Sequence, residues 1–257
     1  MGVAGAGWAT IIIQFVSFCL LLRACAKGSN IHIRFRNFKF KFFYYKMIFQ
    51  GGLPSLARQI LSSLATISLN HAAQPYGDAA IAAMGVVQRV MMFGASAMLG
   101  FGQGFQPVCG FNFGAGLYKR VKDGFWFCVK TSALVLVAIG ALGYVFAPQL
   151  IALFQDDPQV VAFGIAALRF QCLTFPLQSW IIMANMMEQS MGRTLQATFL
   201  SIARQGLFFI PLVLTLPLLL GQTGVEMTQA VADGLTMVCA VPIHLYVMKT
   251  MGKEIKK

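Results

Sequence analysis

The chain has 257 residues, of which 58% are hydrophobic and 11% are charged, whereas a soluble domain carries about 25% charged residues. This composition excludes an ordinary soluble domain and predicts an all-α integral membrane protein embedded in a lipid bilayer. The net charge of +12 comes mostly from basic residues that flank apolar stretches, so it indicates an anionic membrane surface and no nucleic-acid partner. The six cysteines form no CxxC pair and no metal-ligand spacing with histidine, so we expect no metal site and no bound cofactor.

Seven apolar stretches reach the length of about 20 residues that a transmembrane helix needs. They span residues 3–22, 53–72, 79–105, 125–147, 160–190, 195–217 and 227–248. The expected organisation is a transmembrane helix within 1–22, a basic cytoplasmic loop over 23–50, a six-helix unit over 51–249 and a cytoplasmic tail over 250–257. Because the first stretch starts beside Met1, we expect the chain to be part of a longer protein.

The connections between these stretches alternate in charge. The first, third and fifth connections and the C-terminal tail hold lysine and arginine, whereas the alternate ones hold acidic residues instead: Asp78, Asp156, Asp157 and Glu226. Basic connections stay in the cytoplasm. The pattern therefore predicts a multi-pass protein of the plasma (inner) membrane, with its N-terminus outside and its C-terminus in the cytoplasm.

The stretch 53–72 carries a polar stripe. Its members are spaced by four, three and four residues, which places them on one face of a helix: Gln59, Ser63, Thr66 and Asn70. Amides in hydrocarbon are costly unless they have partners, so the stripe predicts one wall of a substrate cavity. Bonding to the helix's own backbone, or to a neighbouring helix, is the alternative explanation.

Four arginines lie inside apolar stretches, where such residues face protein or water: Arg58, Arg89, Arg169 and Arg204. The nearest acidic candidates are Glu188 and Asp233, so at least two arginines should use carbonyls, amides or water instead. We expect each arginine either to anchor the structure or to act in gating or substrate contact. The strings SLARQ (55–59) and SIARQ (201–205) are nearly identical, which an internal repeat or a coincidence explains.

Residues 100–120 are rich in glycine and contain Pro107. Glycine at this density allows two helices to approach closely, or a helix to unwind beside a cavity. Gln103 and Gln106 are the polar residues here that we assign to gating or structure. The segment lacks the GxxxxGK[ST] pattern, so it is not a phosphate loop.

The stretch 160–190 carries a second polar stripe, made of Gln171, Thr174, Gln178, Asn185 and Gln189. Pro176 lies within it and predicts a bend, because proline frees a backbone carbonyl inside a helix. A bent helix with a polar stripe is expected to line a cavity. Methionines such as Met183 could adapt to varied ligands, although ordinary helix packing explains them equally well. The full predicted cavity set is Gln59, Ser63, Thr66, Asn70, Gln178, Met183, Asn185 and Asp233.

Several segments of the chain resemble the multidrug and toxic compound extrusion (MATE) transporters. The most specific is GxGQGxQPxxGxNxGAxxxxRV, from Gly100 to Val121, and the segments 51–59, 175–193 and 201–233 also fit. The resemblance implies two six-helix lobes joined by a cytoplasmic loop. This chain would supply the sixth helix and the C-terminal lobe, so the N-terminal lobe would be a missing partner.

The same resemblance implies export of small amphipathic, mostly cationic drugs in exchange for Na⁺ or H⁺ by alternating access, with no catalysed reaction. In one branch of the family, two acids of this lobe bind the coupling cation. The resemblance places these acids near Ser62 and Phe175, which are not acidic, so we expect no such cation site in this chain. Acids that hold cationic drugs would come mainly from the absent lobe, with Asp233 and Glu188 as local exceptions.

Two other functions stay open from the sequence. The chain could be a folded lobe that does not transport without a partner half, or a seven-helix receptor-like binding protein. A retinal protein would need a lysine within the last helix, and residues 227–248 contain none. An enzyme is not expected, because a membrane enzyme would need clustered acids, a histidine or a nucleophile–base pair at the membrane edge. The adjacent Asp156 and Asp157 precede Pro158, which indicates a turn and a helix start instead.

Overall fold

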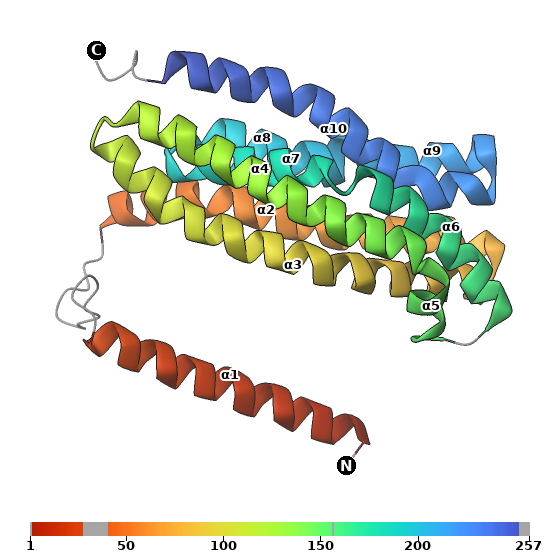
Figure 1. The fold of residues 1–257 in the computed structure, drawn as a ribbon. Helices are drawn as coiled ribbons and strands as arrows, with labels where there is room; N and C mark the ends of the chain where they lie inside the picture. Colours follow the sequence, from red (N-terminus) through yellow and green to blue (C-terminus); the bar gives the residue numbers. More distant parts are fainter. Residues whose placement is uncertain (1, 28–40, 156, 252–257) are drawn as a thin grey trace. The chain divides into compact units, whose positions relative to one another are not determined.

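The structure, a computed structural model, describes residues 2–27, 41–155 and 157–251. Within these ranges it contains helices and no strand (Figure 1). The chain divides into two compact units between Met47 and Ile48. The first unit contains α1 (Gly2–Lys27), whose apolar side chains are exposed along most of its length. Residues 28–40 of the predicted basic loop, together with Asp156 and residues 252–257 of the tail, lie outside the described residues.

The second unit is a bundle of antiparallel helices (Figure 1). Successive long helices run in opposite directions. Two short segments, over residues 74–76 and 147–152, connect helices at one end of the bundle. Its elements are α2 (Phe42–Ala73), η2 (Gln74–Tyr76), α3 (Asp78–Gly114), α4 (Tyr118–Val145), α5 (Ala147–Ala152), α6 (Pro158–Thr174), α7 (Leu177–Ser190), α8 (Thr194–Ile202), η3 (Ala203–Phe209), α9 (Ile210–Leu220) and α10 (Gln222–Thr250).

All seven apolar stretches form helices, but their bounds differ from the prediction. The helix over 53–72 begins earlier, at Phe42, so it includes the end of the expected loop. By length and composition, α3, α4, the run Thr194–Leu220 and α10 can each cross a membrane, and α6 with α7 adds a fifth span. The apolar part of α1, Gly7–Arg23, is shorter than these spans. The polar residues of α2 lower its mean hydropathy, and α2 is not among the candidate spans. Seven is therefore an approximate number of spans.

The glycine-rich end of α3 does not unwind, since the helix continues to Gly114. Gly102 packs directly against α7, since a β-carbon at this position would collide with the sulfur of Met186. Of the two uses of glycine that the sequence allowed, the close approach of two helices is the one the structure shows.

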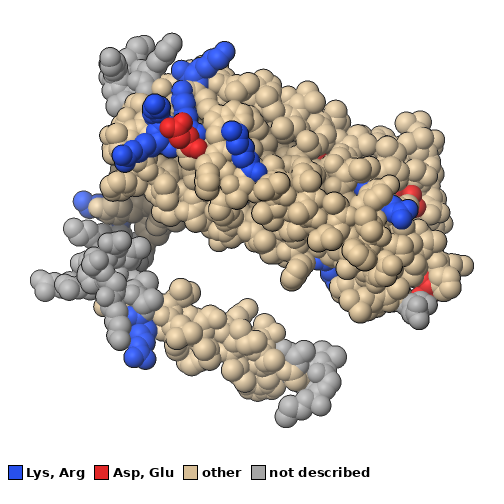
Figure 2. All heavy atoms as spheres, in the orientation of Figure 1, with Lys and Arg blue, Asp and Glu red and all other residues tan. Residues whose placement is uncertain are grey.

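On the face drawn in Figure 2, charged side chains gather toward the two ends of the bundle, and few lie between them. Lys119, Arg120 and Lys122 begin α4, at the same end as Arg193 and Lys249. Asp78, Asp157 and Glu226 lie near the starts of α3, α6 and α10, at the opposite end. The basic and the acidic connections of the sequence thus lie at opposite ends of the bundle. Which end faces the cytoplasm stays a prediction.

Candidate functional site

A cavity of about 400 Å³ lies among α2, α3, the α6–α7 pair, the α8–η3 pair and α10. This volume lies within the range of small-molecule pockets, about 300–1,000 Å³. Apolar side chains such as Met84, Met91, Phe175 and Phe209 form much of its wall. The polar part of the wall consists of Arg58, Gln59, Ser62, Thr66, Gln88, Gln171, Gln178, Asn185, Ser201, Arg204, Gln205 and Gln229.

Two irregularities in the helices position the polar side chains. The helix over 158–190 is broken between Thr174 and Leu177, and its two parts meet at 57°, at the proline that predicts the bend. Gln171 lies just before this break and Gln178 just after it. The second irregularity is η3, a π-helical segment that contains Arg204. Such widened turns are frequent at functional sites.

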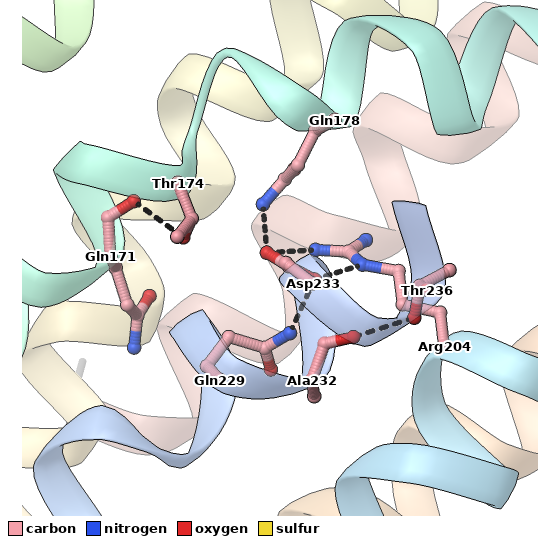
Figure 3. A network of polar contacts seen from close by, with 8 residues as sticks. All are labelled: Gln171, Thr174, Gln178, Arg204, Gln229, Ala232, Asp233 and Thr236. Carbon is pink, nitrogen blue, oxygen red and sulfur yellow. Dashed lines mark hydrogen bonds and ion pairs between the residues drawn. The ribbon is translucent and has the colours of Figure 1, made fainter. Parts of the chain in front are cut away.

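Asp233 of α10 is the centre of a polar network (Figure 3). It is buried, with 1% of its surface exposed. The Nε of Arg204 donates to Oδ1 at 2.8 Å and its second terminal nitrogen to Oδ2 at 3.5 Å. The side-chain amides of Gln178 and Gln229 donate at 3.0 and 2.9 Å. The carboxylate therefore links α7, η3 and α10 behind the cavity wall.

Asn185 ties α7 to α8 in a similar way. Its side-chain nitrogen donates to the carbonyl of Ala197 and, at 3.0 Å, to the hydroxyl of Ser201. Both donor hydrogens are thereby used, and only the amide oxygen is left for another partner.

Comparison with known proteins identifies the family. The model of the MatE family matches residues 54–215, which is more than half of the chain. The chain belongs to the MATE family.

MATE proteins of known name and structure resemble this chain over most of its length. Multidrug export protein MepA of Staphylococcus haemolyticus (strain JCSC1435) is 28% identical over 193 residues, 75% of this chain and 42% of that protein. MepA of Staphylococcus aureus (strain NCTC 8325 / PS 47) is 26% identical over 196 residues, 76% of this chain and 43% of that protein. The chain spans about half the length of these relatives.

Solved structures show the same fold. An outward-facing MATE transporter of the MOP superfamily matches with a TM-score of 0.88 and 22% identity, over 98% of this chain and 58% of that chain. A MOP superfamily transporter from Pyrococcus furiosus, reported with a binding pocket of reversed polarity, matches with a TM-score of 0.88 and 22% identity, over 98% and 57%. The predictions of an all-α membrane protein and of the MATE family are confirmed.

In this MATE fold, four of the predicted cavity residues line the cavity: Gln59, Thr66, Gln178 and Asn185. Asp233 lies behind the wall and reaches it through Arg204, Gln178 and Gln229. The remaining three do not line it. Ser63 and Asn70 are exposed on a neighbouring face of α2, where Ser63 donates to the carbonyl of Gln59 at 3.2 Å. Met183 is fully buried in the core, so it packs helices instead. Substrate contact by the first four stays a prediction.

The four arginines have different surroundings. Arg58 lines the cavity and has no hydrogen-bond or ionic partner among the described residues. Arg89 is exposed on α3, outside the cavity. Arg169 is also exposed, with its guanidinium carbon 5.2 Å from the centre of the Tyr144 ring, a distance typical of a cation–π contact. Only Arg204 has a carboxylate partner within the described part of the chain.

Glu188 pairs with a histidine and not with an arginine. Its Oε1 lies 3.5 Å from Nδ1 of His244, and both side chains are fully buried. The His244 ring stacks on Phe125 with 4.2 Å between ring centres, and Trp180 meets it edge to face. None of these four residues lines the cavity, so this pair belongs to the core among α4, α7 and α10.

Gln106 and Gln189 form a second amide network at the end of the bundle where α3 and α7 finish. Gln106 donates to the amide oxygen of Gln189 at 3.2 Å. Gln189 in turn donates to the carbonyl of Gly51 and the hydroxyl of Ser55, both at 3.2 Å. Gln189 thus joins α3, α7 and α2, whereas Gln103 is exposed and has no such partner among the described residues.

Replacing this amide should loosen that end of the bundle. We expect Gln189→Leu to lower the free energy of unfolding by about 1–2 kcal/mol, since it removes three partly exposed hydrogen bonds. Denaturation in mixed detergent micelles measures the change. Gln103→Leu on α3 is the matched control and should have little effect; equal losses for the two variants would show that the network does not stabilise the fold.

Several cavity residues are absent from the predicted set: Ser62, Gln88, Gln171, Gln205 and Gln229. Three carried a signal in the sequence, and one of them, Gln171, is a member of the polar stripe over 160–190. Gln205 repeats Gln59 in the paired strings SLARQ and SIARQ, and both strings place an arginine and a glutamine in the cavity. Gln229 precedes Asp233 by four residues, the spacing of helix neighbours. Gln88 had no such signal.

Ser62 and Phe175, near which the family resemblance places the cation-binding acids, both line the cavity, and neither side chain is a carboxylate. Among the described residues, no group of three or more histidine, cysteine or acidic side chains could hold a metal ion. The lining side chains offer hydrogen bonds, two guanidinium charges and apolar surface, which suit reversible binding of a small molecule.

Proposed function

We propose that this chain forms one lobe of a two-lobe MATE exporter, and that its cavity binds amphipathic small molecules during multidrug efflux. The observation that carries the proposal is the wall of the cavity, in which unpaired amides alternate with apolar side chains. The names of the MepA relatives support export of drugs. Their greater length supports a second lobe outside this chain.

Four of the amides that line the cavity have no side-chain hydrogen-bond partner among the described residues: Gln59, Gln88, Gln171 and Gln205. A polar group that folding leaves unpaired in an apolar wall is available to a ligand. Methionine and phenylalanine side chains of the same wall supply contact area that adapts to different shapes. The combination suits a site that accepts several compounds.

Alternating access by rocking of two lobes is the expected mechanism. The break at Pro176 and the π segment at Arg204 are the two places where the cavity wall departs from regular helix, and both carry polar lining residues. We infer that changes in backbone angles at these two places reshape the cavity between inward and outward states. We propose Na⁺ or H⁺ as the coupling ion from the family resemblance alone.

The test replaces Gln171, which is buried, lines the cavity and has no side-chain hydrogen-bond partner in the described part of the chain. We expect Gln171→Leu to weaken binding of at least one amphipath by about tenfold, the value of one ligand hydrogen bond, while leaving stability unchanged. The assay is fluorescence titration of the purified chain in nanodiscs with ethidium, Nile red and pyrenebutanoate. Asn185 is a poorer choice, because its loss also breaks the contact between α7 and α8.

Gln103→Leu is the matched control, since Gln103 is exposed outside the cavity. Saturable binding of at least one probe, weakened by Gln171→Leu and not by Gln103→Leu, supports the proposed site. Failure of all three probes to bind saturably, or equal affinities for both variants, would overturn it.

A further inference from the structure

We propose that the cavity recognises the acidic headgroup of an anionic amphipath and that Arg58 binds it. This inference rests on the proposed function and assigns the charge of the ligand. The chemistry meant is a carboxylate, sulfonate or phosphate joined to an apolar body. It is opposite in sign to the mostly cationic drugs that the family resemblance implies.

The first observation is the net charge of the side chains around the cavity. Arg58 and Arg204 line it, and no aspartate or glutamate does among its described lining residues. The nearest carboxylate is Asp233, behind the wall. Two positive charges against one negative leave a net charge of +1 in a wall that is otherwise neutral. A guanidinium keeps its charge at every physiological pH, so the sign is permanent.

Asp233 is not available to a cationic ligand. Its two oxygens already accept four hydrogen bonds, from Arg204, Gln178 and Gln229. Only 1% of its surface is exposed. A cation would have to displace Arg204 from a buried carboxylate, which would leave that guanidinium without its partner. The network in Figure 3 therefore neutralises the acid before any ligand enters.

The donors, by contrast, are open. Arg204 uses two of its five N–H groups on Asp233, so three remain. Arg58 uses none on the described residues. Guanidinium groups bind planar or tetrahedral oxyanions through paired N–H donors. Among its described lining residues, the cavity thus presents free cationic donors and no free anionic acceptor.

The apolar part of the cavity wall determines the apolar body that we expect in the ligand. Met84, Met91, Phe175 and Phe209 give an apolar surface in the same cavity as the two guanidiniums. A small free anion would leave this surface in contact with water. An acid attached to an aromatic or aliphatic body satisfies both parts of the wall, so an amphipath is the expected ligand class.

The test compares two probes that share a body and differ in charge. Pyrenebutanoate and pyrenebutylamine are titrated at neutral pH onto the full chain in nanodiscs of phosphatidylcholine, with empty nanodiscs as the background. We expect the carboxylate to bind at least about tenfold more tightly than the amine. Arg58→Gln should weaken carboxylate binding by about 10- to 100-fold and leave amine binding unchanged or tighter.

Arg89→Gln is the matched control, because Arg89 is an exposed arginine of α3 outside the cavity; it should not change either affinity. Arg58→Lys, which keeps the charge, should retain most of the preference for the carboxylate. Displacement of pyrenebutanoate by phosphatidylglycerol in the nanodisc would assign the same anion chemistry to a lipid headgroup, and no displacement would assign it to a soluble ligand.

The outcomes separate the two proposals. Tighter binding of the amine, or unchanged carboxylate binding in Arg58→Gln, would overturn the anionic assignment while leaving a small-molecule cavity in place. Absence of saturable binding by both pyrene probes, by the neutral Nile red and by ethidium would overturn the proposed function itself.

Discussion

Asp233→Ala is expected to cost the second unit about 3 kcal/mol of its free energy of unfolding. Removing one partner of a buried ion pair typically costs about 3–5 kcal/mol, because the other charge is left uncompensated. Arg204 retains 23% exposure, and the cavity gives water access to it, so the lower end of that range applies. Two amide donors, from Gln178 and Gln229, lose their acceptor as well.

Denaturation in mixed micelles measures this loss, with two comparisons. Asp123→Ala removes an exposed acid of α4 and should change stability by less than about 0.5 kcal/mol. The double variant Asp233→Ala, Arg204→Gln should lose less than the sum of the two single variants, because the charges are coupled. Additive losses would mean that Asp233 and Arg204 do not form a pair in the folded protein.

Gly224→Ala is expected to destabilise the chain by about 2–3 kcal/mol, the usual cost of an overpacked site. Gly224 lies in the first turn of α10, against the last turns of α9. A β-carbon there would collide with the backbone carbonyl of Leu216 and come within 2.7 Å of the nitrogen of Pro217. Backbone atoms cannot rotate away, so α9 and α10 would have to separate.

Gly234→Ala on the same helix is the matched control. No heavy atom lies within 4 Å of a β-carbon at Gly234, and alanine is the better helix former by about 1 kcal/mol. This variant should therefore be neutral or slightly stabilising. Thermal unfolding in detergent distinguishes the two variants; a melting temperature for Gly224→Ala that matches Gly234→Ala would contradict the close contact between α9 and α10.

The fold was largely predictable because it depends on composition and on single residues with strong local effects. Apolar stretches gave the helices, and Pro176 gave the break between α6 and α7. The π segment over Ala203–Phe209 was not predicted. It contains no proline, but Pro211 follows it in the first turn of α9. Proline has no N–H group to donate to the preceding turn, and a single sequence does not show how the helix adjusts to that loss.

The candidate site was predictable only in part, because helical spacing gives a stripe but not its rotation. The stripe on α2 included Ser63 and Asn70, yet the helix turns its neighbouring face, with Ser62 and Leu69, toward the cavity. The pairing of Asp233 with Arg204 was one of few combinations that the scarce acids allowed. The contact of Glu188 with His244 joins distant positions and carried no local signal.

Photoaffinity labelling is the measurement that tests the central claim most directly, namely that this MATE lobe binds an amphipath in the cavity described. The full chain in nanodiscs is irradiated with benzophenone-4-carboxylate, and the labelled peptides are mapped by mass spectrometry. The predicted result is labelling confined to the lining segments 58–69, 84–99, 171–185, 200–209 and 225–229, suppressed by excess pyrenebutanoate. Labelling spread over the exposed apolar side chains of α4, without suppression by pyrenebutanoate, would contradict the account.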